Sequence, residues 1–167
     1  MLCSRVMRVA AVCCALTGVV SSTGCGSKGP QYPEEHARYV QLDKAVEALR
    51  TAYIRKDLSA MEALMLPSDS FDRMVSEVSQ DFQQYGDITL DFSIERVLIE
   101  GDQTDVFFHW QGQWKHRSAD TSVRDRGHGL LRWTGVQSPL LSGVGGDVPF
   151  GMAMRHTVPR TPPSDAS

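Results

Sequence analysis

The spacing of the apolar residues changes once along the chain, at Gly86. Before this glycine, apolar residues recur every three or four positions, which is typical of amphipathic helices. After it, they alternate with polar residues, as in strands that bury one face. A chain that places helical patterns before strand patterns is predicted to fold as α+β, with its helices packed in a curved, mainly antiparallel sheet.

Three helices are predicted before the change. The first spans about residues 34–56, where Asp57 interrupts the pattern and can cap a shorter second helix. Ser68 or Ser70 can cap a third helix, for which Gly86 is the expected C′ residue. The first half of the domain is therefore expected to be helical throughout.

About four strands are predicted after the change. Residues 88–94 alternate regularly, and the apolar phase then slips, which predicts a β-bulge near Glu95 and Arg96. A hairpin turn is expected at residues 101–102, because glycine and aspartate favour turns. The remaining strands are expected near residues 106–114, 123–134 and 140–144.

The N-terminal segment has the pattern of an export signal. Arg5 and Arg8 precede an apolar stretch, residues 9–20, which is shorter than the roughly 20 residues that a membrane-spanning helix needs. This pattern predicts a signal peptide over residues 1–24. All four cysteines lie within the first 25 residues, so no disulfide is expected in the folded part.

The end of this leader, residues 22–25, resembles the bacterial lipobox, in which a cysteine is acylated and becomes the N-terminus. The resemblance implies a lipid such as palmitate on Cys25, and a membrane anchor in the bacterial cell envelope. Gly26 after the cysteine implies the outer membrane, with the domain facing the periplasm. The alternative is ordinary cleavage near Gly24, which would leave Cys25 as a free thiol.

The mature chain is predicted to contain one domain, because its length suits a single core. The lipidated cysteine and a tether fill residues 25–33, the domain spans residues 34–151, and residues 152–167 are expected to be a disordered tail. Acids outnumber bases in residues 34–105, and bases outnumber acids in residues 106–160. This asymmetry indicates solvated faces of opposite charge, and a nucleic-acid partner is not expected.

Two segments, residues 52–61 and 146–151, resemble the nuclear transport factor 2-like superfamily, which includes SnoaL-like proteins and ketosteroid isomerase. The first is similar to the helix-break-helix of those domains, and the second to the exit from their last strand. The resemblance covers residues 42–151 and implies a cone-like fold with a shallow cavity, because residues 67–70 leave no room for a hairpin that larger members carry. It also implies that Phe150 folds back onto the helices, whereas an exposed docking position is the alternative.

No catalytic, cofactor-binding or metal-binding signature was found. Ketosteroid isomerase combines carboxylic acids with a phenol, and nothing in the spacing here brings such groups together. The histidines lack metal-ligand spacing. Gly127 and Gly129 are expected to be strand kinks. His109 and His128 could be cross-strand neighbours in a site sensitive to pH near neutrality, or two exposed polar positions.

The predicted function is that of a membrane-anchored envelope lipoprotein whose domain binds an apolar small molecule or an envelope protein. No catalytic residue, cofactor or metal is expected. Tyr53, Trp110 and Trp114 are candidate ligand-binding residues, since large aromatics can line an apolar cavity, although core packing would also explain them. The alternative function is a small SnoaL-like isomerase, dehydratase or hydrolase. The oligomeric state stays open, with a dimer among the alternatives.

Overall fold

The computed structural model describes residues 33–118 and 120–157, so the predicted signal peptide, Cys25 and most of the tether lie outside the described residues. Three helices come first, α1 (Pro33–Ile54), α2 (Leu58–Glu62) and α3 (Asp69–Gln84). Four strands and a short helix follow, β1 (Tyr85–Glu100), β2 (Gln103–His116), β3 (Ser122–Thr134), β4 (Leu140–Gly146) and α4 (Met152–Thr157). None of the described helices combines the length and apolar character needed to cross a membrane.

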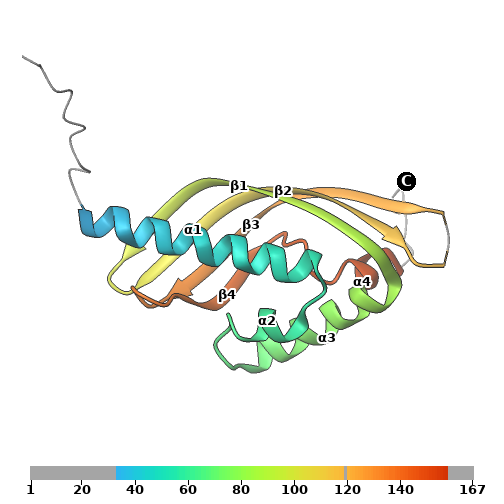
Figure 1. Ribbon diagram of the computed structural model, residues 1–167, viewed down its shortest axis with the longest axis horizontal. Helices are drawn as coiled ribbons and strands as arrows, with labels where there is room; N and C mark the ends of the chain where they lie inside the picture. The colour runs from blue at the N-terminus through green and yellow to red at the C-terminus, as the bar shows by residue number, and fades with distance from the viewer. Residues whose placement is uncertain (1–32, 119, 158–167) are drawn as a thin grey trace, which may run out of the picture. The chain divides into compact units, whose positions relative to one another are not determined.

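The strands form one antiparallel sheet in the order β1-β2-β3-β4. Figure 1 shows this sheet curving around α1, with α2 and α3 on the same side. The α+β fold with helices packed in a curved sheet of four strands is therefore confirmed.

The core lies between the helices and the inner face of the sheet. The alternation along β2 turns every second side chain inward, and the helices present apolar stripes to it. The largest fully buried side chains include Trp110, Trp114, Trp133, Tyr53, Tyr85, Phe108 and Phe150. Burying this much aromatic surface supplies the main driving force for folding.

The break between α1 and α2 comprises residues 55–57, and the side chains of two of them stabilise it. Asp57 caps α2, as predicted, because its side chain accepts a hydrogen bond from the Ala60 amide at 3.0 Å. Lys56 has a φ of 59°, a left-handed conformation that few residues other than glycine adopt. Its ammonium group donates to the carbonyls of Tyr85 and Gly86. The start of β1 therefore stabilises the turn.

The third helix begins as predicted and ends differently. Ser68 is its N-cap, and the hydroxyl accepts a hydrogen bond from the Phe71 amide at 3.4 Å. Gly86 follows the C-cap residue Tyr85 and so occupies the predicted C′ position, but without the left-handed conformation that a glycine usually adopts there. Tyr85 leaves the helix with extended backbone angles, and β1 starts at that same residue, so the chain makes no left-handed turn there.

The predicted β-bulge is confirmed. Ile94 pairs with Phe108 and Arg96 pairs with Phe107, which leaves Glu95 without a partner on β2. In contrast, β3 keeps its register with β2 at Gly127 and Gly129, so neither glycine forms a bulge, and their role as strand kinks stays a prediction. A Cβ atom at either glycine would lie 2.8 to 2.9 Å from an aromatic ring of β2. The two glycines make room for large inward rings.

The domain extends past its predicted limit at residue 151. Met152 to Thr157 form α4, and Met152 and Ala153 are buried, so the expected disordered tail is corrected for these residues. Residues 158–167 of that predicted tail lie outside the described residues. Phe150 is 2% exposed, and its predicted return onto the helices is confirmed.

Arg38 ties the beginning of α1 to the turn between β1 and β2. Its guanidinium donates to the carbonyl of Gly101 at 2.6 Å, to the carbonyl of Gln103 at 3.2 Å and to the hydroxyl of Thr104 at 3.0 Å. The amide of Gly135 in turn donates to the Asp102 carbonyl of the same turn. The first turns of α1 are thus fixed to β2 and to the β1–β2 turn, and that turn is bonded to the residue that follows β3.

Candidate functional site

The interior contains a hydrogen-bonded polar cluster, Tyr53, Asp81 and Trp114, which we call the buried cluster. The Tyr53 hydroxyl donates to Oδ2 of Asp81 at 2.6 Å, and the Trp114 indole N–H donates to the Tyr53 hydroxyl at 2.9 Å. All three side chains are fully inaccessible to solvent. They come from α1, α3 and β2, so the cluster joins the helices to the sheet.

Asp81 also binds the segment that follows the last strand. Its Oδ2 accepts a hydrogen bond from the Gly151 amide at 2.8 Å, and its Oδ1 accepts one from the Ala153 amide at 2.6 Å. These amides lie at the start of α4, where backbone N–H groups have no partner within the helix. The carboxylate of Asp81 therefore caps α4 from α3.

Burial changes the acidity of these groups. It raises the pKa of Asp81 above its usual value, although the hydrogen bonds from Ala153 and Tyr53 act in the opposite direction. Burial also raises the pKa of Tyr53 well above its usual value, and the neighbouring charge of Asp81 adds to the effect. Burial raises the pKa of Tyr85 to about 12. Both phenols are therefore neutral at physiological pH.

The sequence reasoning missed this cluster, because it found no spacing that brings a carboxylic acid and a phenol together. A signal was nevertheless present. Asp81 continues the apolar stripe of α3 that runs through Phe71, Met74 and Val78, at helical spacing. A carboxylate on a buried stripe needs hydrogen-bond donors that are also buried. The position of Asp81 therefore predicts that such donors exist, but it does not show which residues supply them.

The predicted ligand-binding residues Tyr53, Trp110 and Trp114 do come together in the interior. The rings of Trp110 and Trp114 meet edge to face at 6.0 Å, and the Phe150 ring lies 5.1 Å from that of Tyr53. The Trp110 indole N–H donates to the Asp147 carbonyl at 2.6 Å. These contacts are all within the protein, and the assignment of the three residues as ligand-binding stays a prediction.

A second candidate site lies on the opposite, outer face of the sheet. A depression of about 480 Å³ crosses β1, β2 and β3 there, and we call it the outer groove. Its side chains stand in two cross-strand rows, because residue 113 pairs with residues 89 and 124, and residue 111 pairs with residues 91 and 126. The outer groove is lined by Thr89, Asp91, Gln111, Gln113, Arg124 and Arg126, among others.

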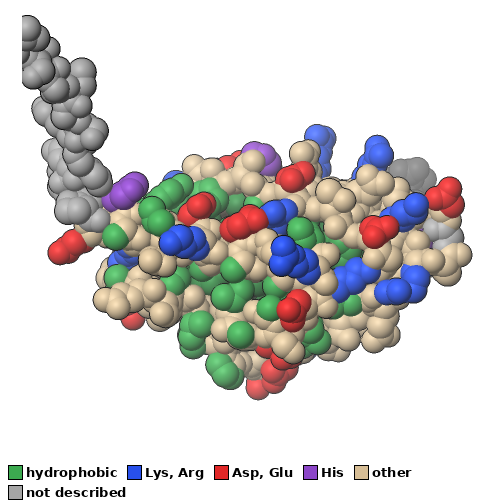
Figure 2. Space-filling view, in the orientation of Figure 1, with side chains coloured by type: hydrophobic (Ala, Val, Ile, Leu, Met, Phe, Trp, Pro, Cys, Tyr) green, Lys and Arg blue, Asp and Glu red, His purple; other side chains and the backbone are tan. Residues whose placement is uncertain are grey.

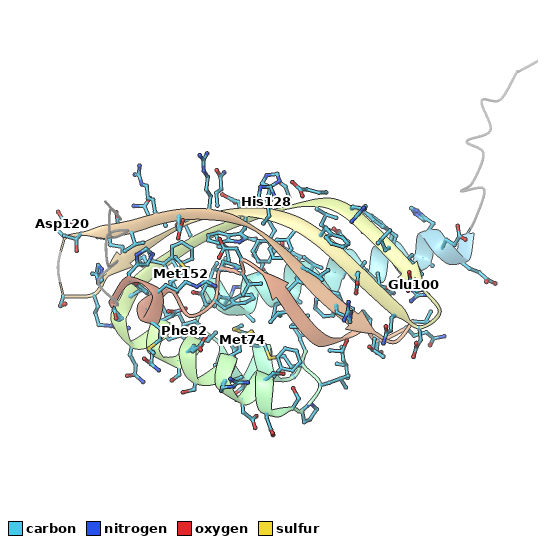
Figure 3. All side chains as sticks on the ribbon, turned by 180° about the vertical axis from the view of Figure 1, so that it is seen from behind. Met74, Phe82, Glu100, Asp120, His128 and Met152 are labelled. Atoms are coloured by element: carbon cyan, nitrogen blue, oxygen red, sulfur yellow. The ribbon has the colours of Figure 1, made fainter. Side chains whose placement is uncertain are left out.

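His109 and His128 form the next row beside the outer groove, and their predicted cross-strand pairing is confirmed. The Nδ1 atom of each ring lies 3.3 Å from Oε1 of Glu95, the residue at the bulge. Figure 3 shows His128 on the outer face and Met152 on the inner side of the sheet. Within residues 33–118 and 120–157, no group of acidic, histidine or cysteine side chains is arranged to hold a metal ion.

Comparisons by sequence give no relative: no protein-family model matches the chain, and no curated protein matches it. Solved structures are similar in fold. A nuclear transport factor 2-like superfamily protein from Salmonella enterica aligns with a TM-score of 0.58 at 9% identity, over 68% of this chain and 93% of that one.

Two further structures carry enzyme names. A putative dehydratase of the nuclear transport factor 2-like family from Streptomyces avermitilis aligns with a TM-score of 0.55 at 12% identity, over 68% of this chain and 99% of that one. A hexachlorocyclohexane dehydrochlorinase from Novosphingobium barchaimii aligns with a TM-score of 0.58 at 7% identity, over 70% of this chain and 90% of that one. At these identities the similarity concerns the fold.

Proposed function

We propose a function for the chain from its two candidate sites. The domain has the fold of the nuclear transport factor 2-like superfamily, and that fold does not by itself select a function. The chain is a membrane-anchored binding protein of the bacterial cell envelope, without catalysis, and it holds its ligand or partner on the outer face of the sheet. The observation that carries this proposal is the filling of the interior by the protein's own side chains.

The filled interior leaves the buried cluster out of reach of a substrate. Phe150 and Met152, at most 2% exposed, pack over it from the segment that Asp81 caps. General acid–base chemistry needs the reacting atom within hydrogen-bond distance of the catalytic group. Tyr53 and Asp81 already bind each other and their neighbours, which supports a structural role for the cluster.

Tryptophan fluorescence tests the closed interior. The chain has three tryptophans, and Trp110, Trp114 and Trp133 are at most 1% exposed. We expect acrylamide to quench the folded full-length chain with a small fraction of the slope measured after unfolding in urea. A slope close to the unfolded value, reduced again by an apolar ligand, would contradict the proposal and indicate an accessible cavity.

A second candidate function, a small enzyme acting in an apolar cavity, is favoured by a specific observation. Tyr53 and Asp81 form a desolvated phenol–carboxylate pair with raised pKa values, and perturbed pairs of this kind mark many active sites. The enzyme names of two structural neighbours point the same way. This function requires Phe150 and α4 to move, so the same quenching measurement separates the two candidates.

The proposed anchor rests on Cys25 and on the leader before it, and places the domain in the periplasm at the outer membrane. We expect Cys25→Ser to abolish labelling by radioactive palmitate and to release the chain from the membrane fraction. The matched control is Cys14→Ser, which lies in the predicted signal peptide and should leave labelling unchanged. Retention of label by the Cys25 variant would exclude this anchor.

A further inference from the structure

We propose that the outer groove binds an anion that carries two acidic groups, carboxylate or phosphate, through Arg124 and Arg126. The inference rests on the proposed function, which places binding on the outer face of the sheet. It adds the chemical class of the ligand and the residues that recognise it.

The two arginines have no acidic partner within the described part of the chain. Two other arginines are paired with acids, Arg132 with Asp105 at 2.8 Å and Arg155 with Asp147 at 2.7 Å, and Arg96 of β1 lies over the Phe107 ring. Arg124 and Arg126 are exposed and line the outer groove instead. Guanidinium groups that line a depression without a partner can bind an incoming anion with two parallel hydrogen bonds each.

The strand geometry sets the distance between the two cations. Arg124 and Arg126 are alternate residues of β3, so both point to the outer face and their Cα atoms lie about 7 Å apart. Register pairing holds Gln113 beside the first and Gln111 beside the second. Each anion-binding position therefore has an amide side chain next to it, which can bind a hydroxyl or carbonyl group of the same ligand.

Two acidic residues, Asp91 and Asp125, also line the outer groove, and each has contacts of its own elsewhere. Asp91 stands on β1, one strand beyond the glutamines, and it interacts electrostatically with Arg50 of α1. Asp125 bonds to the Arg126 amide through Oδ1, and its Oδ2 lies 3.8 Å from His156 of α4.

The outer groove is lined by two arginines, Arg124 and Arg126, and by two aspartates, Asp91 and Asp125, so the guanidinium groups would hold an anion through directed hydrogen bonds and not through an excess of positive charge. Lys115 Nζ lies 3.5 Å from Asp120 Oδ1, and Glu95 Oε1 lies 3.3 Å from Nδ1 of both His109 and His128 in the adjacent row. Figure 2 shows Lys and Arg side chains, with Asp and Glu side chains among them, toward the end of the domain where β2 runs into β3. Among the described residues, Arg124 and Arg126 are the cations on the β3 side of the groove that have no acidic partner.

Isothermal titration calorimetry of the full-length chain in mild detergent, at low ionic strength, tests the proposal. The probes are adipate and hexane-1,6-bisphosphate, which separate carboxylate from phosphate, and acetate as the ligand with one acidic group. We expect one or both dianions to bind more tightly than acetate, and Arg124→Gln or Arg126→Gln to weaken that binding about tenfold. Arg73→Gln, which removes an exposed arginine from α3, is the control and should change nothing.

Three results would overturn the inference. The first is that neither dianion binds, and the second is that the dianions bind the arginine variants as tightly as the unmodified chain. The third is that sedimentation equilibrium shows a dimer that the arginine variants dissociate, which would make a second copy of the chain the occupant of the outer groove. Thermal melts of each variant establish that it is folded. If the dianions do not bind but the tryptophans stay protected from acrylamide, the anion proposal is wrong and the proposed function is not contradicted. The two results are independent, because acrylamide quenching reports on the interior alone.

Discussion

Replacing Phe150 by alanine is expected to lower the free energy of unfolding by about 3–5 kcal/mol, the range for a well-packed buried phenylalanine. The side chain is 2% exposed, and its ring meets that of Tyr53 at an interplanar angle of 77°. The loss leaves a cavity beside the buried cluster, in a region already fixed by hydrogen bonds and unable to collapse freely. Urea denaturation followed by circular dichroism measures the difference.

The control for this variant is Val136→Ala, at a position that is 48% exposed. It should change the free energy of unfolding by less than about 0.5 kcal/mol. If Phe150→Ala falls within the same limit, the return of this segment onto the helices is wrong, and Phe150 becomes a candidate docking residue on the surface.

Replacing Asp81 by alanine is expected to destabilise the domain by a similar amount, about 3–5 kcal/mol, for a different reason. The Tyr53 hydroxyl and the amides of Gly151 and Ala153 all lose their acceptor, and each unsatisfied buried donor costs about 1–3 kcal/mol. Hydrogen exchange should show α4 losing protection before the sheet does. Asp72→Ala, at an exposed position of the same helix, is the control.

The pH dependence of stability follows from the same residue. Because burial raises the pKa of Asp81, the folded state holds this proton more tightly than the unfolded chain does. The stabilisation that protonated Asp81 contributes is complete below about pH 4, the pKa of an aspartate in the unfolded chain. It is lost as the pH rises from there through the pKa of Asp81 in the folded state. Subtracting the stability curve of Asp81→Ala from that of the unmodified chain should therefore give a difference that falls with pH across this window. A difference that rises would contradict the direction of the shift.

Local periodicity was sufficient to predict most elements of the fold. The slip in phase after Ile94 predicted the bulge, and the pairing of His109 with His128 could be anticipated because each lies near the middle of its strand. These features depend on residues that are neighbours in the sequence or that pair across a hairpin. Both relations can be read from the amino-acid sequence alone.

Features that depend on long-range contacts were not predictable in this way. The left-handed backbone at Lys56 is stabilised by carbonyls about 30 residues later in the chain, at Tyr85 and Gly86. Helix α4 is too short to be recognised from its own residues, and its cap, Asp81, belongs to another helix. The outer groove likewise depends on the pairing register of three strands. The sequence shows its arginines, but it does not show which residues of β1 and β2 lie beside them.

The contacts of Arg38 determine how the domain responds to a pulling force. A load applied to the chain ahead of Pro33 enters through the first turns of α1, where Arg38 is bonded to the β1–β2 turn and, through that turn, to Gly135. Unwinding of the helix past Arg38 must first break these hydrogen bonds. A force applied at this end is therefore shared between α1 and the β1–β2 turn, and does not act on the helix alone.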